Sequence, residues 1–227
     1  MARRTSAKEA ALLRYLAHPY QLLGVVLAVV VGLIGHNLVQ AWVADRLGDR
    51  EPRRRGFLRP DLHRQADGIG AIATLVVPFG WGFAAPVPIE ARFRRQRMRA
   101  TIALLAGPAY LVGLLFGAVA IGLHTNDEHA LEITGHAIAT LAGLVVLSLI
   151  PIPPLAGGRV FFLYAPTSPG WQRARFTLGD TNAGRLVAFG ILILPILFPL
   201  LPDVVHDLAE PLVRGVIRAL GTSPNPL

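Results

Sequence analysis

The hydrophobic positions of this chain fall into long, nearly uninterrupted runs separated by short polar segments. Runs at about 20–44, 100–123, 133–150 and 186–201 are close to the length that an α-helix needs to cross a bilayer. A further apolar stretch, 68–89, is interrupted by prolines and glycines. We therefore predict an all-α integral membrane protein. It would be a bundle of about five to six transmembrane segments, of which 68–89 is broken or re-entrant.

These runs suit a single membrane domain over residues 1–227. Residues 1–19 are basic and precede the first run, and we expect them to form an interfacial arm that is retained rather than cleaved. Residues 20–160 would form the core, and residues 161–227 would supply a C-terminal span and tail.

Composition supports this interpretation and excludes several classes of function. The chain is 53% hydrophobic and 16% charged, which leaves little charge for a water-facing surface. It has no cysteine, so disulfides, thiolate catalysis and cysteine-based zinc sites are excluded. The net charge of +8 comes from arginines in loops beside the apolar runs. Membrane topology explains that pattern, and we do not expect nucleic acid as a partner.

The charged loops predict an orientation. The loop 46–67 holds seven arginines and the loop 92–99 holds five, whereas Asp127, Glu128 and Glu132 follow the run that ends near 123. The positive-inside rule places both arginine loops in the cytoplasm. Because these loops flank 68–89, that segment must return to the side from which it started. The basic N-terminal arm favours the opposite orientation, but it carries fewer charges.

A polar cluster lies deep in the first apolar run, within the sequence GHNLVQAWVADRLGD. Residues four apart share one face of a helix, so His36 and Gln40 point the same way, with Asn37 adjacent. His36 precedes Arg46 by ten residues, about 15 Å along a helix. Polar groups at that depth face the protein interior or a cavity. Taken alone, a buried histidine bonded to a neighbouring group would explain the position.

Several stretches occur together in a characteristic order: HNLVQAWVADRLGD, AGPAYL and LIPIPPLAGG. In that order they resemble the site-2 protease family of intramembrane zinc metalloproteases, over about residues 30–160. In that family the first motif reads HExxHAxxxxRLGD, where two histidines hold zinc and the glutamate activates water. A later LDG supplies an aspartate as third ligand. The resemblance also implies a site that opens toward the cytoplasm.

The resemblance fails at the positions that perform the chemistry. His36 matches the first ligand, but Asn37 stands at the general base and cannot accept a proton as a carboxylate does. Gln40 replaces the second histidine and is a poor zinc ligand. Ala156 replaces the aspartate and offers no donor atom. We expect no catalytic residue and no bound metal or other cofactor, with His36 as the one retained ligand.

The retained pieces of the motifs shape the backbone. Prolines remove helical hydrogen bonds and enforce a kink, and small residues permit close helix approach. Gly48 in RLGD suits the left-handed conformation that ends a helix. We predict that these residues preserve a groove able to receive a transmembrane segment. The groove-shaping residues are Pro151, Pro153, Pro154, Gly107 and Pro108.

Other histidines are not expected to complete a metal site. His63 lies in the first arginine loop and would have to fold back into the membrane. His124, His129 and His136 belong to the opposite side of the membrane in the predicted topology. The sequence HTNDEH could bind a metal weakly, but it is more typical of an exposed polar loop.

The sequence therefore predicts a pseudoprotease: a catalytically inactive, site-2-protease-like protein in the plasma membrane of a prokaryote. Its vestigial site would face the cytoplasmic side. Its partners would be the lipid bilayer and a transmembrane segment of another protein, which it would bind or scaffold. One alternative is an active intramembrane zinc metalloprotease with an unorthodox site, which would require zinc. A second is a small channel or carrier with His36, Asn37 and Gln40 as its polar path.

Overall fold

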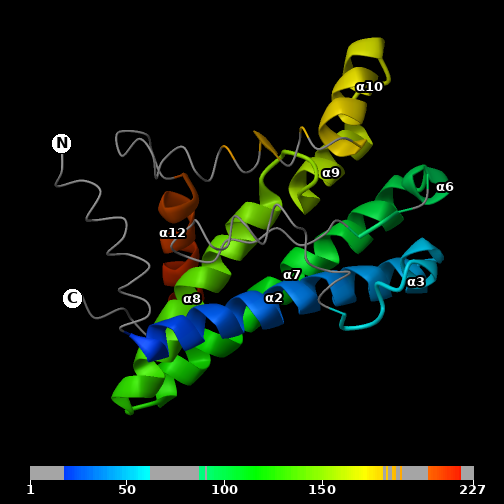
Figure 1. Cartoon of the computed structure of the whole chain (residues 1–227). Helices are drawn as coiled ribbons and strands as arrows, with labels where there is room; N and C mark the ends of the chain where they lie inside the picture. The colour runs from blue at the N-terminus through cyan, green and yellow to red at the C-terminus, as the bar shows by residue number, and fades with distance from the viewer. Residues whose placement is uncertain are drawn as a thin grey trace, which may run out of the picture.

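The structure is a computed structural model that describes residues 18–61, 87–89, 91–180, 183, 186–187, 190 and 204–220. Within these residues the chain forms helices joined by turns and extended linkers, without any strand (Figure 1). The N-terminal arm, nearly all of 68–89 and most of 186–201 lie outside the described residues. The helices are α2 (Pro19–Arg46), α3 (Glu51–Arg54), α6 (Ala91–Arg94), α7 (Arg97–His124), α8 (Glu128–Leu149), α9 (Ala156–Tyr164), α10 (Pro169–Arg175), the π-helical turn η1 (Phe176–Asp180) and α12 (Val204–Ala219).

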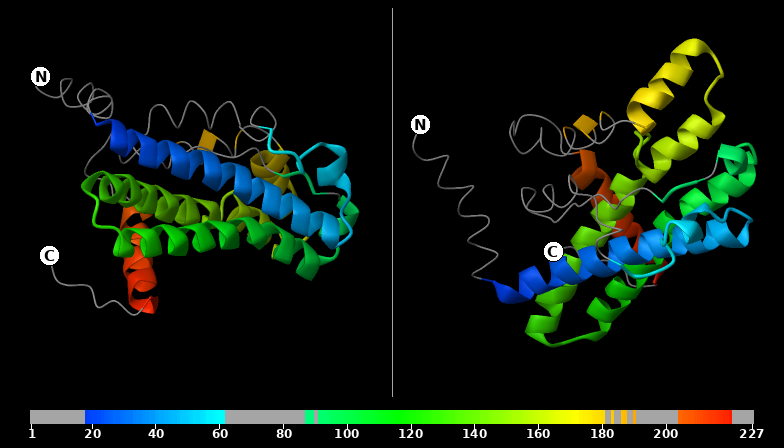
Figure 2. Two further views of the ribbon diagram at one scale, coloured as in Figure 1. Left: turned by 90° about the horizontal axis from the view of Figure 1, so that it is seen from below. Right: turned by 45° about the vertical axis from the view of Figure 1, so that its right-hand side comes forward.

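Three long helices, α2, α7 and α8, form the centre of the molecule (Figures 1 and 2). By length and composition each could cross a membrane, which confirms the predicted helices over 20–44, 100–123 and 133–150. The molecule is thus an α-helical protein with at least three such helices in its described part. The predicted total of five to six spans includes segments that lie outside the described residues.

The three helices alternate in direction. Near one end of the bundle, Ala44 of α2 packs with Phe93 and Ala100, which lie at or just before the start of α7. At the other end, the Tyr20 ring stacks on the His129 ring with 4.1 Å between centroids. Helix α7 is therefore antiparallel to α2, and α8 is parallel to it. Both described arginine-rich segments consequently lie at the first end, as the predicted topology requires.

Glycines allow the backbones of these helices to approach closely. A Cβ atom added to Gly24 of α2 would lie 2.3 Å from the carbonyl oxygen of Ile133 in α8. A Cβ atom added to Gly35 would lie 2.3 Å from the hydroxyl oxygen of Tyr110 in α7. Small residues at such crossings are typical of membrane helix packing. The close contacts explain why α2 keeps glycine at both positions.

The apolar core lies between α2, α7 and α8, and α12 adds to it from one side. Helix α12 crosses the bundle steeply (Figure 2) and packs chiefly against α8. Its Val205, Ala209 and Val216 are buried, while Glu210 and Arg214 form an exposed ion pair. The segment 204–220, which has mixed polarity in sequence, is therefore an amphipathic helix with its apolar side on the core.

The ends of the helices follow their sequence signals. Helix α2 is followed by Gly48 with a φ of 106°, which confirms the predicted left-handed residue. Helix α8 begins after Asp127, whose carboxylate accepts a hydrogen bond of 2.8 Å from the backbone N–H of Ala130. After Leu149 the chain leaves helical geometry until Ala156. The prolines in that interval therefore produce the break that the sequence predicts.

Candidate functional site

The polar cluster of α2 lies inside the protein. The exposed fraction is 9% for His36, 1% for Asn37 and 2% for Gln40. The side chains of His36 and Gln40 face α7, and α9 also packs against α7. The prediction that they face the interior is confirmed. The arrangement of their polar atoms then decides what chemistry they can perform.

Gln40 makes a specific hydrogen bond to a carbonyl that proline leaves free. Its side-chain Nε2 donates to the backbone oxygen of Leu104 in α7 at 2.8 Å. Within a regular helix that oxygen would accept from the N–H four residues later, but Pro108 occupies that position and has no N–H. Gln40 thus takes the place of the missing donor. The Gln40 side chain therefore joins α2 to α7.

This pairing predicts coupling between two substitutions. Gln40→Ala should destabilise the protein by about 1 kcal/mol, because it leaves a buried carbonyl without its donor. In a Pro108→Ala background the backbone N–H of residue 108 can bond to Leu104, so the cost of Gln40→Ala should fall. A double-mutant cycle, measured by unfolding in mixed micelles, tests this expectation.

Gln21 offers a matched control for that cycle. Its Nε2 donates to Glu132 of α8 at 2.8 Å, far from the proline. The cost of Gln21→Ala should therefore be the same with proline or alanine at position 108. Equal costs for Gln40→Ala in the two backgrounds would contradict the role assigned to Gln40.

One ring nitrogen of His36, Nε2, could bind a metal, but this atom lies against α7. Its Nδ1 is 3.2 Å from Oδ1 of Asn37. An amide oxygen only accepts hydrogen bonds, so Nδ1 carries the hydrogen and Nε2 presents a lone pair. Nε2 is buried without a hydrogen-bond partner. A Cβ atom added to Gly107 would lie 2.5 Å from it, so this glycine provides the space for the imidazole.

Helix α9 brings Ala156 and Arg159 to this region. Ala156 is the first residue of α9 and is 5% exposed. Arg159, one turn later, is partly buried, and its positive charge interacts electrostatically with the imidazole of His36. Burial and, to a lesser extent, the nearby charge of Arg94 lower the pKa of Arg159, Asp49 raises it, and together they bring it to about 10. The guanidinium is thus a fixed positive charge beside the site at neutral pH.

Sequence reasoning missed Arg159 and the buried Asp49. Asp49 is fully buried and accepts a hydrogen bond of 3.0 Å from the backbone N–H of Glu51. The available signal for Arg159 was its spacing, since residues three apart on a helix share a face with Ala156. The signal for Asp49 was its place directly after Gly48. Neither residue supplies a ligand at the positions of the family motif.

The donor set around His36 does not fit a catalytic zinc ion. Such an ion takes three protein ligands and keeps an open position for water. Here Gln40 uses its amide within the helix pair, and Ala156 has no donor atom. Across the described part of the chain, no three His, Cys, Asp or Glu side chains gather closely enough to hold a metal ion.

The remaining predicted histidines are at the far end of the bundle, apart from His63, which lies outside the described residues. His124 and His136 each bond through Nδ1 to a carbonyl of the preceding turn, and His129 stacks on Tyr20. Their placement opposite the arginine-rich end agrees with the predicted topology. They lie too far along the bundle to join His36.

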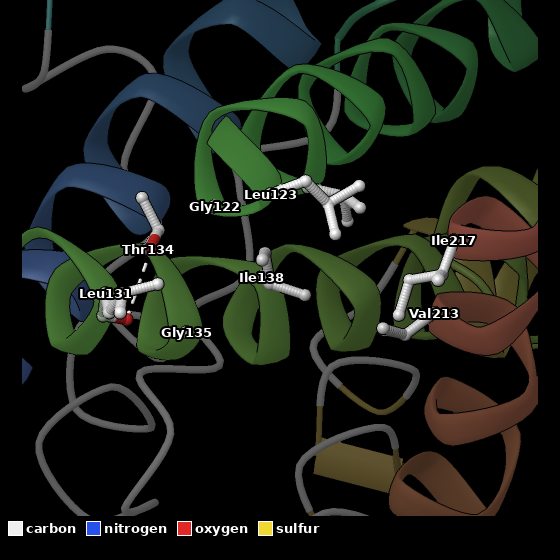
Figure 3. Close-up of a pocket in the computed structure, with 9 residues that line it drawn as sticks. Gly122, Leu123, Leu131, Thr134, Gly135, Ile138, Val213 and Ile217 are labelled. Atoms are coloured by element: carbon white, nitrogen blue, oxygen red, sulfur yellow. Dashed lines mark hydrogen bonds between the residues drawn. The ribbon is translucent and has the colours of Figure 1, made fainter. Parts of the chain in front are cut away.

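An apolar cavity of about 180 Å³ lies near that far end, between α7, α8 and α12 (Figure 3). Its one lining hydroxyl, on Thr134, donates to the carbonyl oxygens of Ala130 and Leu131 within α8. None of the lining residues is charged, so the cavity lacks groups for acid–base or metal chemistry. The lining residues are Val119, Gly122, Leu123, Leu131, Thr134, Gly135, Ile138, Val213 and Ile217.

Comparison of the sequence with known proteins finds a homologue. The chain is similar to a Bacillus subtilis (strain 168) protein named "Putative zinc metalloprotease YwhC". The two are 28% identical over 204 residues, covering 83% of this chain and 90% of that protein. The homologue supports a metalloprotease-like family for this chain. No protein-family model matches the chain, and no solved structure matches it.

Proposed function

We propose that this protein is a catalytically inactive relative of the site-2 proteases that binds or scaffolds a transmembrane segment of another protein. The observation that carries the proposal is the bond from Gln40 to the oxygen of Leu104. At the position of a zinc ligand, the chain carries a residue that completes the backbone hydrogen bonding around Pro108. Neutral or apolar residues at positions 37 and 156 support the same conclusion, because neither can act as base or ligand.

The proposal includes an orientation and a cellular location. The arginine-rich end of the bundle would face the cytoplasm of a prokaryotic cell, with the vestigial site on that side. The arrangement of α3 and α6 at one end and of Asp127 and Glu128 at the other supports it. The break between α8 and α9, with Gly107 and Pro108 nearby, would keep a partner segment close to the former catalytic region.

Metal analysis tests the inactive state directly. Protein purified in detergent without chelator should contain far less than one zinc ion per chain. His36→Ala should change neither that content nor hydrolysis of transmembrane model substrates, because both should already be at background. Near-stoichiometric zinc that is lost in His36→Ala, together with cleavage that is lost with it, would overturn the proposal.

Partner binding is tested separately. Crosslinking in native membranes, followed by affinity capture, should recover a defined transmembrane protein at a constant ratio to this chain. His36→Ala should leave that ratio unchanged, because no metal is needed. Recovery of no membrane protein above the level of an unrelated membrane bait would contradict the scaffolding role. The zinc analysis would still test, independently, whether the protein is catalytically inactive.

An active protease is the second candidate, favoured by the name of the homologue. His36 also keeps an unprotonated Nε2, the state that a zinc ligand needs. This candidate requires further ligands from outside the described residues, such as His63. It predicts that the parent chain holds zinc and that both His36→Ala and His63→Ala lose it. An inactive protein would show the same low zinc content in the parent chain and in both variants.

A further inference from the structure

Helix α10 is placed beside the arginine-rich end of the bundle by contacts of α9. The hydroxyl of Tyr164, the last residue of α9, lies 3.1 Å from the hydroxyl of Thr101 in α7. The guanidinium of Arg97 lies over the Tyr164 ring, 5.9 Å from its centroid. These contacts hold the end of α9 against the N-terminal end of α7. Helix α10 starts five residues later and lies at the same end as α3 and α6 (Figures 1 and 2).

Helix α10 and its following turn carry large aromatic side chains that are partly exposed in the described structure. No residue of α10 is buried. Trp171 is 36% exposed and Phe176 is 64% exposed, and Phe161 of α9, which contacts Trp171, is 47% exposed. In water such a cluster would be costly. Tryptophan is typical of the membrane interface, where part of the side chain meets hydrocarbon and part meets polar headgroups.

The charges of this hairpin complement an anionic lipid surface. Arg173 is exposed and has no hydrogen-bond or ion-pair partner within the described residues, while Arg175 donates to the carbonyl of Phe162. Both lie on α10 between Trp171 and Phe176. Two arginines between two aromatic side chains, beside a membrane-crossing bundle, fit an element that lies at the membrane interface. Arginines near an anionic leaflet are attracted to its phosphates.

We propose that α9 and α10 form an interfacial hairpin that binds anionic phospholipid at the arginine-rich end of the protein. Trp171 and Phe176 contact the boundary between headgroups and acyl chains, and Arg173 binds the lipid phosphate. This site is separate from the polar cluster of α2. It does not depend on whether the protein is a protease or a scaffold.

The absence of cysteine from the sequence makes a depth measurement direct. A spin label is attached to Phe176→Cys in vesicles of phosphatidylcholine mixed with phosphatidylglycerol, and its accessibility to oxygen and to a water-soluble nickel complex is compared. Val26→Cys on the exposed side of α2 gives the lipid reference, and Asn126→Cys in the α7–α8 loop gives the water reference. The label at 176 should fall between the two references. A value equal to that at 126 would overturn the proposal.

Lipid selectivity is tested with matched arginines. Arg173→Gln should weaken binding of a fluorescent phosphatidylglycerol to the detergent-solubilised protein by about fivefold, the effect expected for one interfacial charge. Arg214→Gln removes an exposed arginine of α12 that is paired with Glu210, and it should leave binding unchanged. Equal effects of the two substitutions, or equal binding of phosphatidylcholine and phosphatidylglycerol, would contradict the assignment of Arg173.

Discussion

Introducing the three residues of the site-2 protease motif that this chain resembles, Asn37→Glu, Gln40→His and Ala156→Asp, should convert a chain that we expect to purify almost free of zinc into one that holds about one zinc ion. Residue 40 lies one turn after His36 on the same face of α2. Residue 156 begins α9, which packs against α7, the helix that His36 and Gln40 contact. The two histidines and the aspartate would then provide three ligands, and the glutamate would provide a base.

The restoration also has a structural cost. Histidine at position 40 removes the amide that bonds to Leu104, so the triple variant should be less stable than the parent chain until zinc binds. Addition of zinc should raise its unfolding midpoint, because a ligand that binds only the folded state stabilises that state. The parent chain should show no such rise. Elemental analysis and unfolding with and without zinc provide two separate measurements.

A matched control places the carboxylate elsewhere. Ala165 is buried like Ala156 and directly follows α9, about 13 Å further along the chain by helical rise. Asn37→Glu and Gln40→His combined with Ala165→Asp carry the same charges but cannot bring the aspartate to His36. This control should bind far less zinc. Equal zinc in the two triple variants, or zinc in the parent chain, would show that the alignment of positions 40 and 156 with zinc ligands is wrong.

The sequence predicts the long helices and the shared face of the polar cluster well, because both follow from local periodicity. The apolar runs at α2 and α7 are long enough for a helix to cross a bilayer, and they therefore predict both helices. The spacing of four between His36 and Gln40 places both on one face. The break after Leu149 follows from prolines that cannot donate helical hydrogen bonds. None of these inferences needs knowledge of which helices are neighbours.

The bond of Gln40 could not be predicted in the same way. It requires that α7 lie beside α2 with Leu104 at the level of Gln40, and two helices can pack in many registers. The sequence marks Pro108 as a bend but does not reveal which side chain replaces its missing N–H. The position of Arg159 near His36 likewise depends on how α9 returns to α7. Tertiary packing, rather than periodicity, therefore determines which contacts the buried polar residues of α2 make.

Gly158→Ala should unfold the region where α8 meets α9. A Cβ atom at position 158 would lie 2.1 Å from the carbonyl carbon of Ile152 and 2.3 Å from the nitrogen of Pro153. Both atoms belong to the backbone and cannot move as a flexible side chain would. Overpacking typically costs 1–3 kcal/mol, and a backbone clash lies at or above the upper limit, so we expect a loss of at least about 3 kcal/mol. Thermal unfolding in detergent measures it.

Gly117→Ala in α7 is the matched control, because among the described residues no atom outside the local helix backbone lies within 4 Å of its added Cβ. There the intrinsic preference of helices for alanine over glycine applies, and the stability should be unchanged or slightly higher. Comparing the two variants shows whether the glycine after the prolines is required for close packing of the backbone. If Gly158→Ala is as harmless as Gly117→Ala, close packing does not require the glycine. If it destabilises as expected, glycine is needed at position 158 because α9 lies against the turn that precedes it, and this need is structural.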